Sequence, residues 1–414
     1  MTSSDHKKNG AGLRILYLVP PGETAEALSA FSFLSEEIDY LINSGVDAVI
    51  VVPEGGDVYA GRFTKVAAPS KSLGVIFGTT WFLLRHWRLI WPVLLRHPRQ
   101  CLYHGRFEKF VAEVAAEYDV HIIHSHFGWP AGWGGVLAAR QRRVPLVTSL
   151  RGMDIIIDES IDYGNRRDPF FGSAIQVLLA HARHVTAVSD YIMNQALELG
   201  AQAETSTTIL KGVHLEKFIA DRSSVDARAE LGLNNVFTVL SVGGLIPRKG
   251  MEQVIAAFAV VPEPAQLVIC GRGPELNNLS ALAQRLDVAD RVYFRGQVDR
   301  DTIPTYFAAC DVFVLASKKE ASGNVLCEAL ATGRPVVTTR SGGPPEYVSH
   351  GKTGFVAAPG DAEEMASYLV QLQQDEALRK RFGAAARRAA ESRFAYERMI
   401  DDILGIYRQV TGGK

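Results

Sequence analysis

Two glutamates, Glu320 and Glu328, stand eight positions apart in the stretch KKEASGNVLCEAL, which covers residues 318–330. Glu320 precedes a Ser-Gly-Asn turn, and Glu328 falls in an apolar segment whose pattern predicts a helix ending at Gly333. Carboxylates accept strong hydrogen bonds from sugar hydroxyls, and eight helical steps span roughly 12 Å. That length is similar to the span of a nucleoside diphosphate sugar. A lone pair of glutamates is more often solvated, so the neighbouring motifs decide the interpretation.

The start of the predicted helix, at Gly323, Asn324 and Val325, offers backbone N–H groups that have no acceptor inside the helix. Together with the helix dipole, these groups attract phosphate. Arg248 and Lys249 follow a strand and a glycine turn in LSVGGLIPRKG, where two cations suit a diphosphate. The glutamates would then bind opposite ends of the ligand, while the helix start and the cations bind its middle.

Glycine turns at three strand ends would let a nucleotide approach the backbone closely. Gly243 and Gly244 form the turn before the two cations, and Gly271 opens the turn GRGP, which suits a base or ribose. A further glycine loop follows a strand in RSGGPPEYV, at residues 340–348.

These motifs need a framework, and the hydrophobic pattern predicts alternating strands and helices. Short apolar runs bounded by turn residues predict strands at 13–19, 46–53, 120–126, 145–150 and 184–189. From residue 236 a second series follows, in FTVLSVGG, LVICGRG, RVYFRG, DVFVLAS and PVVTTRSGG. Strands separated by helices form parallel sheets covered on both faces. The fold class is therefore α/β, with two doubly wound, Rossmann-like domains that bind ligands beyond the carboxyl ends of their strands.

The length of 414 residues also favours two domains. The polar stretch 214–235 lacks a strand pattern and marks the junction. We expect an N-terminal domain at 1–215, a C-terminal domain at 216–390, and a final helical segment at 391–414 that packs back on the N-terminal domain. Two such domains would face one another across a cleft, a common place for ligands.

Composition excludes several classes of protein. The formal net charge of −1 gives no indication of a nucleic-acid partner. The four cysteines are scattered and include no C-x-x-C motif, which favours a reducing, cytoplasmic compartment. The start MTSSDHKKNGAG is polar, so we expect no secretory signal. The sequence contains no run of 18 uninterrupted apolar residues, so we expect no membrane-spanning helix.

One segment, 58–107, contains no Asp or Glu and is rich in arginine, with Trp81, Trp87 and Trp91 among its apolar residues. Basic, aromatic and apolar residues together predict helices that lie in a membrane interface beside anionic lipids. The alternative is a buried pair of helices whose arginines extend to water. The sequence leaves both interpretations open.

The motifs together resemble the family 4 retaining glycosyltransferases of GT-B architecture over nearly the whole chain. The match rests on the E-x7-E pair, the RKG turn, GRGPE, and the long block VLCEALATGRPVVTTRSGGPPEYVSHGKTGFV. The resemblance implies that Glu320 binds a hydroxyl of the donor hexose, Glu328 binds the ribose, and Lys249 binds the diphosphate. The family's second phosphate-binding cation is an arginine where this chain has Gly244, and Arg248 is the candidate substitute.

The N-terminal half resembles the family more loosely. IIHSHFGWPAG, at 122–132, is similar to a strand end whose histidine faces the transferred sugar, which assigns that role to His126. VPLVTSLRGMD, at 144–154, resembles a segment that usually reads His-Gly-x-Asp, but Arg151 replaces the histidine. A core histidine satisfied by backbone groups is the alternative for His126.

The resemblance implies a retaining, metal-independent enzyme that needs no cofactor, since its UDP- or GDP-sugar is a substrate. It also implies a lipid-linked or polysaccharide acceptor, and the basic segment adds the cytosolic membrane surface as a partner. No oligomeric state is indicated. A D-x-D sequence at 299–301 can mark a metal-bound sugar nucleotide, but here it precedes TIPTYFAAC and predicts a helix cap.

Three other functions remain. A phosphorylase or epimerase would keep the fold, although no lysine-cofactor motif indicates the former. A nicotinamide enzyme is disfavoured because the first strand runs into PPGETAEAL and lacks G-x-G-x-x-G. A non-catalytic protein that binds a sugar nucleotide is favoured by the departures at Gly244 and Arg151.

Overall fold

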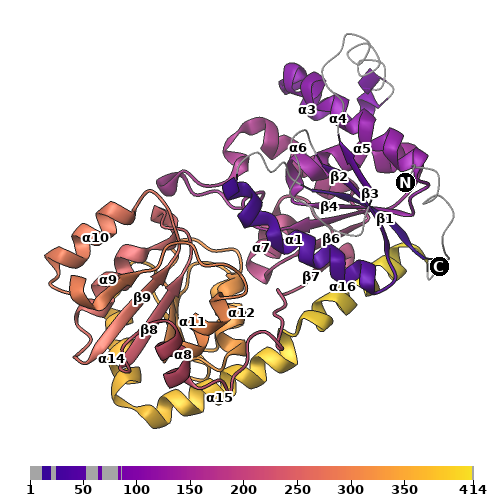
Figure 1. The fold of residues 1–414 in the computed structure, drawn as a ribbon. Helices are drawn as coiled ribbons and strands as arrows, with labels where there is room; N and C mark the ends of the chain where they lie inside the picture. The colour runs from indigo at the N-terminus through magenta and orange to yellow at the C-terminus, as the bar shows by residue number, and fades with distance from the viewer. Residues whose placement is uncertain (1–11, 20–24, 53–63, 68–82, 85, 413–414) are drawn as a thin grey trace. The chain divides into compact units, whose positions relative to one another are not determined.

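The computed structural model describes residues 12–19, 25–52, 64–67, 83–84 and 86–412, which are drawn as ribbon in Figure 1. The chain divides into two compact units. Unit 1 comprises Met1–Val188, Ile192–Ile209 and Ile400–Lys414. Unit 2 comprises Ser189–Tyr191 and Leu210–Met399.

Unit 1 contains one parallel sheet with the strand order β3-β2-β1-β4-β5-β6-β7 in the described part of the chain. The strands are β1 (Arg14–Leu18), β2 (Asp47–Val52), β3 (Thr64–Ala67), β4 (Ile122–His126), β5 (Leu146–Leu150), β6 (His184–Ala187) and β7 (Ser206–Thr208). The central strands β4 and β5 are buried along their whole length, as expected for a parallel sheet with helices on both faces. In their register His126 lies beside Ser149.

The helices that belong wholly or mostly to unit 1 are α1 (Ala25–Asn43), α3 (Trp87–Arg96), α4 (Pro98–Glu117), α5 (Trp133–Arg142), α6 (Pro169–His181), α7 (Asp190–Glu198) and α16 (Tyr396–Val410). Shorter turns are η2 (Gly128–Gly132), η3 (Glu159–Ile161), η4 (Asn165–Arg167) and η5 (Ala203–Thr205). Local sequence fixes several helix starts. Pro98 and Pro169 occupy first helical positions, and the Asp168 carboxylate caps α6 by accepting the N–H of Phe170.

Unit 2 contains a second parallel sheet, with the order β10-β9-β8-β11-β12-β13. The strands are β8 (Phe237–Val242), β9 (Ala265–Cys270), β10 (Val292–Phe294), β11 (Val312–Leu315), β12 (Val336–Thr339) and β13 (Gly354–Ala357). Alternate residues of one strand join separate cores. Leu267 and Ile269 of β9 belong to one buried cluster, whereas Val268 and Cys270 belong to another. Because side chains alternate across a strand, both faces of this sheet are covered.

The helices that cover this sheet are α8 (Ser224–Glu230), α9 (Met251–Ala259), α10 (Leu276–Arg285), α11 (Ile303–Ala309), α12 (Asn324–Ala331), α13 (Pro344–Tyr347), α14 (Ala362–Gln374) and α15 (Glu376–Arg393). Two short turns are η6 (Pro247–Lys249) and η7 (Ala289–Arg291).

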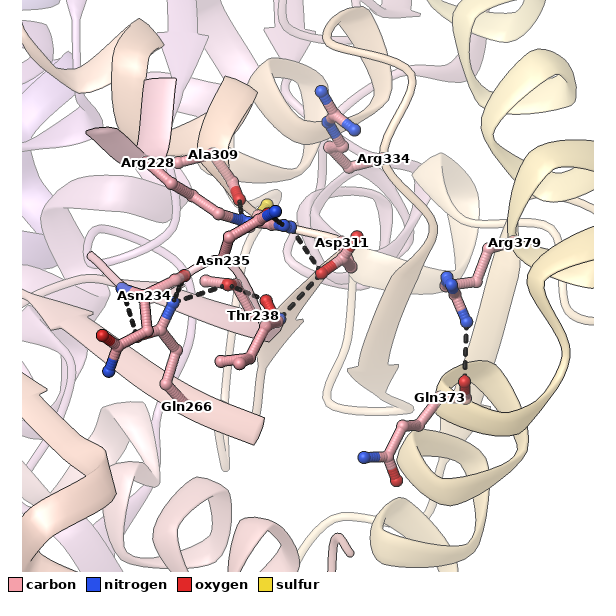
Figure 2. Close-up of polar contacts among 12 residues, drawn as sticks. Arg228, Asn234, Asn235, Thr238, Gln266, Ala309, Asp311, Arg334, Gln373 and Arg379 are labelled. Carbon is pink, nitrogen blue, oxygen red and sulfur yellow. Dashed lines mark hydrogen bonds and ion pairs between the residues drawn. The ribbon is translucent and has the colours of Figure 1, made fainter. Parts of the chain in front are cut away.

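A polar network closes the amino-terminal end of the unit 2 sheet (Figure 2). The Arg228 guanidinium, which is buried, donates to the Ala309 carbonyl at 2.8 Å and to the Asp311 carboxylate at 2.6 Å. Asp311 also accepts the backbone N–H of Thr238, and the Thr238 hydroxyl accepts the side-chain N–H of Gln266. This network occupies the amino-terminal ends of the strands. The candidate site lies at the opposite edge of the sheet, in the loops that follow the carboxyl ends of the strands.

The α/β fold class and the alternation of strands and helices predicted from the sequence are confirmed. Strands β3, β7 and β13, which the sequence did not predict, lie at sheet edges or are only three or four residues long. The D-x-D sequence forms a turn just before α11, in which the Asp299 carboxylate accepts the backbone N–H of Thr302 at 2.8 Å. The expected side-chain cap of the helix is not formed, because the N-cap residue is Thr302 and its side chain makes no capping hydrogen bond. No group of three or more His, Cys, Asp or Glu that could hold a metal is present among the described residues.

The segment 58–107 is described only in part, since 58–63, 68–82 and 85 lie outside the described residues. Its described part contains α3 and the first half of α4. Both helices bury apolar side chains, and α3 also leaves Trp87 and Trp91 nearly half exposed. Within the described ranges, no helix is both long enough and apolar enough to cross a bilayer.

Candidate functional site

The carboxylate of Glu320 is the centre of a cluster at the carboxyl end of β11. Strand β11 ends at Leu315, and the loop that follows places Glu320 in a bridge to Gly342, where its backbone N–H donates to the Ser341 carbonyl at 2.9 Å. The side chain is 10% exposed. One carboxylate oxygen, Oε2, accepts the Lys249 ammonium at 2.6 Å and the Ser317 hydroxyl at 3.1 Å.

The two cations of the RKG sequence reach this carboxylate from the turn η6. Arg248 Nη1 lies 3.5 Å from Glu320 Oε2 and donates to the Lys319 carbonyl at 2.9 Å. Gly250 ends the turn with φ of +64°, and a Cβ there would lie 2.1 Å from the Ala316 carbonyl oxygen. Only glycine fits this close approach, which holds both cations against the loop after β11.

The electrostatics of the cluster favour the ionised form of Glu320. Burial raises the pKa of its carboxyl, but the charges of Lys249 and Arg248 and the hydrogen bonds from Lys249 and Ser317 outweigh burial. The pKa therefore lies below its usual range, and Glu320 is a carboxylate near neutral pH. A charged acceptor with two adjacent cations is suited to bind a ligand with both hydroxyls and phosphates.

The glycine turns beside the cluster differ in the space that they leave. A Cβ at Gly271, where φ is +153°, would lie 1.9 Å from the carbonyl oxygen of Gly243. The two strand ends therefore touch through their backbones, and the Gly243 N–H donates to the Cys270 carbonyl at 3.0 Å. Gly244 has room, because a Cβ there would lie no closer than 3.9 Å to the nearest heavy atom. Its backbone is also outside the left-handed region.

The helix α12 begins where the sequence predicted, after Gly323, whose φ is +88°. Asn324 and Val325 form its first turn, and Glu328 is its fifth residue and half-buried. The expectation of eight helical steps between the glutamates was wrong, because Glu320 lies in an extended bridge before the helix. The glycine turn at 321–323 therefore separates the two carboxylates, with the helix start between them in sequence.

A second buried cluster lies in unit 1, at the ends of β4 and β5. His126 ends β4, and Arg151 follows β5. Arg151 Nη2 is 2.9 Å from His126 Nδ1 and 2.9 Å from each carboxylate oxygen of Glu37 on α1. Glu37 and His126 are fully buried. The structure thus joins two residues that the sequence singled out to a third, Glu37, that it did not.

The Arg151 contact decides which nitrogen of a neutral His126 carries the proton. A guanidinium has only donors, so Nδ1 of His126 accepts from Arg151. The proton of the neutral ring then lies on Nε2. His126 can consequently present an N–H donor, while Glu37 holds the guanidinium that enforces this tautomer.

His124 lies two residues before His126 on the same face of β4, and its ring packs near the ring of His126. Its Nδ1 is 2.6 Å from the Tyr407 hydroxyl on α16, and its Nε2 is 2.8 Å from the Ser149 hydroxyl. Burial lowers the pKa of His124 to about 3, so this ring is neutral at ordinary pH. Its centroid lies 4.4 Å from that of His126.

Asp154 joins the loops that carry His126 and Arg151. Its carboxylate accepts the backbone N–H of Gly128 and of Gly152, each at 2.8 Å. Burial raises the pKa of Asp154, whereas these backbone bonds act in the opposite direction. The Gly-x-Asp part of the RGMD sequence is thus a brace between two strand ends.

The sequence analysis missed Glu37, Ser317 and the bracing role of Asp154. Glu37 carried a detectable signal, because it shares the buried face of α1 with Leu34, Ile38 and Leu41. A glutamate on the buried face of a helix nearly always has a partner for its charge. Ser317 carried no comparable signal, since serine is common after strands.

Comparisons with known proteins place both units in one class of enzyme. Residues 33–210 match the glycosyl transferase 4-like domain, and residues 225–389 match the glycosyl transferases group 1 family. N-acetyl-alpha-D-glucosaminyl L-malate synthase of Bacillus anthracis is 31% identical over 305 residues, covering 72% of this chain and 77% of that protein. The lipopolysaccharide core biosynthesis glycosyltransferase LpsE of Rhizobium meliloti (strain 1021) is 38% identical over 184 residues, 44% of this chain and 52% of that protein.

A solved structure shares the fold across both units. Alr3699/HepE of Anabaena, in complex with UDP-glucose, superposes with a TM-score of 0.73 over 96% of this chain and 100% of that chain, at 21% identity. The fold and the relatives define this protein as a glycosyltransferase. Specifically, the chain belongs to family 4 of the glycosyltransferases, with the GT-B architecture.

Proposed function

We propose that this glycosyltransferase moves a hexose from UDP- or GDP-sugar to a glycan or glycolipid acceptor, with retention of configuration and without a metal or other cofactor. The observation that carries the proposal is the Glu320 cluster, in which a buried carboxylate meets Lys249 and Arg248 at the carboxyl end of a parallel strand. Ligands of doubly wound sheets bind at such ends. The name of the Anabaena structure, which includes UDP-glucose, supports a nucleotide-sugar donor.

In this proposal the bound donor replaces some of the contacts that Glu320, Lys249 and Arg248 make with one another. The Lys249 ammonium has three N–H donors, and Glu320 accepts one of them. Lys249 and Arg248 stabilise the negative charge of the departing diphosphate, together with the N–H groups that begin α12. Glu320 accepts a hexose hydroxyl, and Glu328 accepts a ribose hydroxyl.

The chemical step retains the anomeric configuration through attack from the face that the diphosphate leaves. The bond from the anomeric carbon to the phosphate oxygen breaks, and the acceptor oxygen bonds to that carbon on the same side. The acceptor proton passes to the departing phosphate oxygen. His126, with Nε2 protonated through Arg151 and Glu37, donates a hydrogen bond to the transferred sugar.

The acceptor is proposed to be presented at the cytosolic surface of a membrane. The basic, acid-free segment 58–107 and the exposed Trp87 and Trp91 of α3 support this site of action. The name of the Rhizobium relative includes lipopolysaccharide core biosynthesis, which supports a glycolipid acceptor. The name of the Bacillus relative includes L-malate, so a small acceptor belongs in the same assay.

The test is a transfer assay with EDTA present. UDP- and GDP-hexoses are supplied with lipid-linked glycans, lipopolysaccharide core fragments and L-malate, and nucleoside diphosphate release is followed. Proton NMR of the product reads the anomeric configuration directly. The proposal expects transfer with retention in the presence of EDTA, and loss of transfer in Lys249→Ala. An inverted product, or activity that returns only with a divalent metal, would overturn the mechanism.

A further inference from the structure

A pocket of about 690 Å³ lies on unit 1, between α3, α5 and α6. Arg88 and Arg96 of α3, Arg140 of α5 and His181 of α6 are among the residues that line it. Neither Asp nor Glu is among the described residues that line it. Helix α3 packs against α6 and α4 at the periphery of this unit (Figure 1). The pocket therefore concentrates positive charge without an internal carboxylate to neutralise it.

An apolar rim adjoins this charge. Trp87, Trp91 and Leu95 follow one another at four-residue intervals along α3, and their residues are 44%, 46% and 61% exposed. Leu84, just before the helix, is 56% exposed. The two indole rings meet edge to face at 5.5 Å, and the Arg88 guanidinium lies 5.7 Å from the Trp87 ring centroid.

The arginines of the pocket and the exposed apolar residues beside it together favour one class of ligand over another. A soluble phosphate would use the arginines but not the exposed tryptophans and leucines. Tryptophan is enriched at the headgroup level of membranes, where its ring is partly apolar and partly hydrated. Arginine forks bind phosphate oxygens in pairs. A surface that offers both at adjacent positions matches the phosphate and the upper acyl chain of a lipid.

We propose that this pocket binds the phosphate of an anionic phospholipid, while Trp87, Trp91 and Leu95 insert at the headgroup level of the same leaflet. The inference rests on the proposed membrane-side function and adds to it a specific lipid-binding site. It assigns the charge-dependent part of membrane binding to Arg88, Arg96 and Arg140. Basic residues of unit 1 that are described outside the pocket, such as Arg142, Arg143 and Arg183, should contribute only long-range attraction.

The experiment is sedimentation of the full chain with two kinds of vesicle, one of phosphatidylcholine alone and one of equal parts phosphatidylcholine and phosphatidylglycerol. Replacing Arg88, Arg96 and Arg140 together by Gln should weaken binding to the anionic vesicles by about fivefold for each arginine, near a hundredfold in all. Replacing Arg142, Arg143 and Arg183, which lie outside the pocket, changes the net charge equally. This control should lose less than about tenfold.

Four results would overturn the inference. Equal losses in the pocket and control variants would show attraction by net charge alone, and equal binding of the neutral vesicles would exclude recognition of anionic lipid. Adding inorganic phosphate at constant ionic strength distinguishes the ligand source, because release by phosphate would favour a soluble anion site. A Trp87→Ser and Trp91→Ser double variant should also bind the anionic vesicles more weakly, and unchanged binding would contradict insertion.

A parallel measurement keeps this inference separate from the proposed function. Nucleoside diphosphate binding should be unchanged in the pocket variant, which leaves unit 2 intact. Failure of donor binding in the unmodified protein would remove the proposed function and leave the vesicle result standing. Failure of vesicle binding with normal donor binding would remove only the lipid site.

Discussion

Unit 1 and unit 2 each bury a glutamate against a cation, but the two pairs are built differently. Glu320 lies in a loop after a strand and receives Lys249 and Arg248 from a short turn. Its side chain keeps 10% exposure. Glu37 lies within α1, is fully buried, and binds the Arg151 guanidinium with both oxygens. Glu320 therefore lies in a loop with slight exposure to solvent, whereas Glu37 lies in a helix with almost none.

The difference indicates two separate tasks. A carboxylate on a loop, with cations on a glycine-hinged turn, can exchange its partners for a ligand at small structural cost. A fully buried carboxylate on a helix cannot, because removing either partner leaves a buried charge. We infer that Glu320 meets the substrate, whereas Glu37 positions Arg151 and, through it, His126. The predictions below separate these tasks.

The largest expected effect is on the stability of unit 1. Glu37→Ala leaves the Arg151 guanidinium buried without its carboxylate and should lower the free energy of unfolding by about 3–5 kcal/mol. All five tryptophans of the chain lie in unit 1, so urea denaturation followed by tryptophan fluorescence reports this unit. A decrease in the free energy of unfolding of less than about 1 kcal/mol would mean that the Glu37–Arg151 ion pair contributes little to stability.

A double variant, Glu37→Met with Arg151→Met, sharpens this result. Replacing both partners by apolar groups should restore most of the stability. It should not restore transfer, because nothing then fixes the tautomer of His126. Full recovery of both stability and transfer would reduce the Glu37 pair to a structural element.

The second effect is on catalysis in unit 2. Glu320→Ala removes the carboxylate that we propose accepts a hexose hydroxyl, and it should lower kcat/KM by about a hundredfold, the equivalent of about 3 kcal/mol. Binding of the bare nucleoside diphosphate should be spared, since Lys249 and Arg248 remain. Steady-state kinetics and calorimetry on the same preparation check both parts. Equal losses in transfer and nucleotide binding would contradict the division of roles.

The third effect is a pH dependence confined to unit 1. The pKa of His124 is about 3 in the folded protein and 6.5 in its ordinary state, so the folded state binds protons less readily. Its contribution to stability is complete above about pH 6.5 and is lost as the pH falls toward 3. At about pH 5 the loss should reach about 2 kcal/mol.

Tryptophan-monitored denaturation at about pH 7 and about pH 5 measures this loss. The matched control is His124→Gln, which lacks a titrating ring and should show a flatter profile than the natural protein. The same slope in both proteins would assign the acid sensitivity to other groups.

The smallest effect concerns the family's missing arginine. Gly244 has space for a side chain and an ordinary backbone conformation, so Gly244→Arg should fold and should tighten nucleoside diphosphate binding by about tenfold. Gly271→Ala is the contrasting variant, because its Cβ would strike the Gly243 carbonyl. Calorimetry of both variants is the measurement. Weaker binding in Gly244→Arg would show that an arginine at this turn adds no favourable contact to the nucleotide.

The sequence alone supports most of the unit 2 site, because short loops after buried strands carry it. Glu320, Lys249 and Gly271 sit next to strand ends, so predicting the strands predicts where their loops meet. The exception is the spacing of Glu320 and Glu328, since the sequence pattern does not show that Glu320 bridges to Gly342 before the helix begins.

The unit 1 site was harder to predict because its partners come from distant positions. Glu37 and Arg151 are 114 residues apart, and Tyr407 lies 283 residues from His124. Hydrophobic periodicity indicates which face of α1 is buried but not which strand end it covers. The edge strands β3 and β7 were missed for another reason, since their sequences TKVA and STT contain too few apolar residues to give the pattern of a buried strand.

The most direct test of the central claim, that the Glu320 cluster is a nucleotide-sugar site, is calorimetric titration with UDP, GDP and ADP in EDTA. The natural protein and Lys249→Ala are compared under the same conditions. We predict that one nucleotide binds the natural protein in the micromolar range and that Lys249→Ala weakens this binding by at least about tenfold. No binding of any nucleotide, or binding that Lys249→Ala leaves unchanged, would contradict the claim.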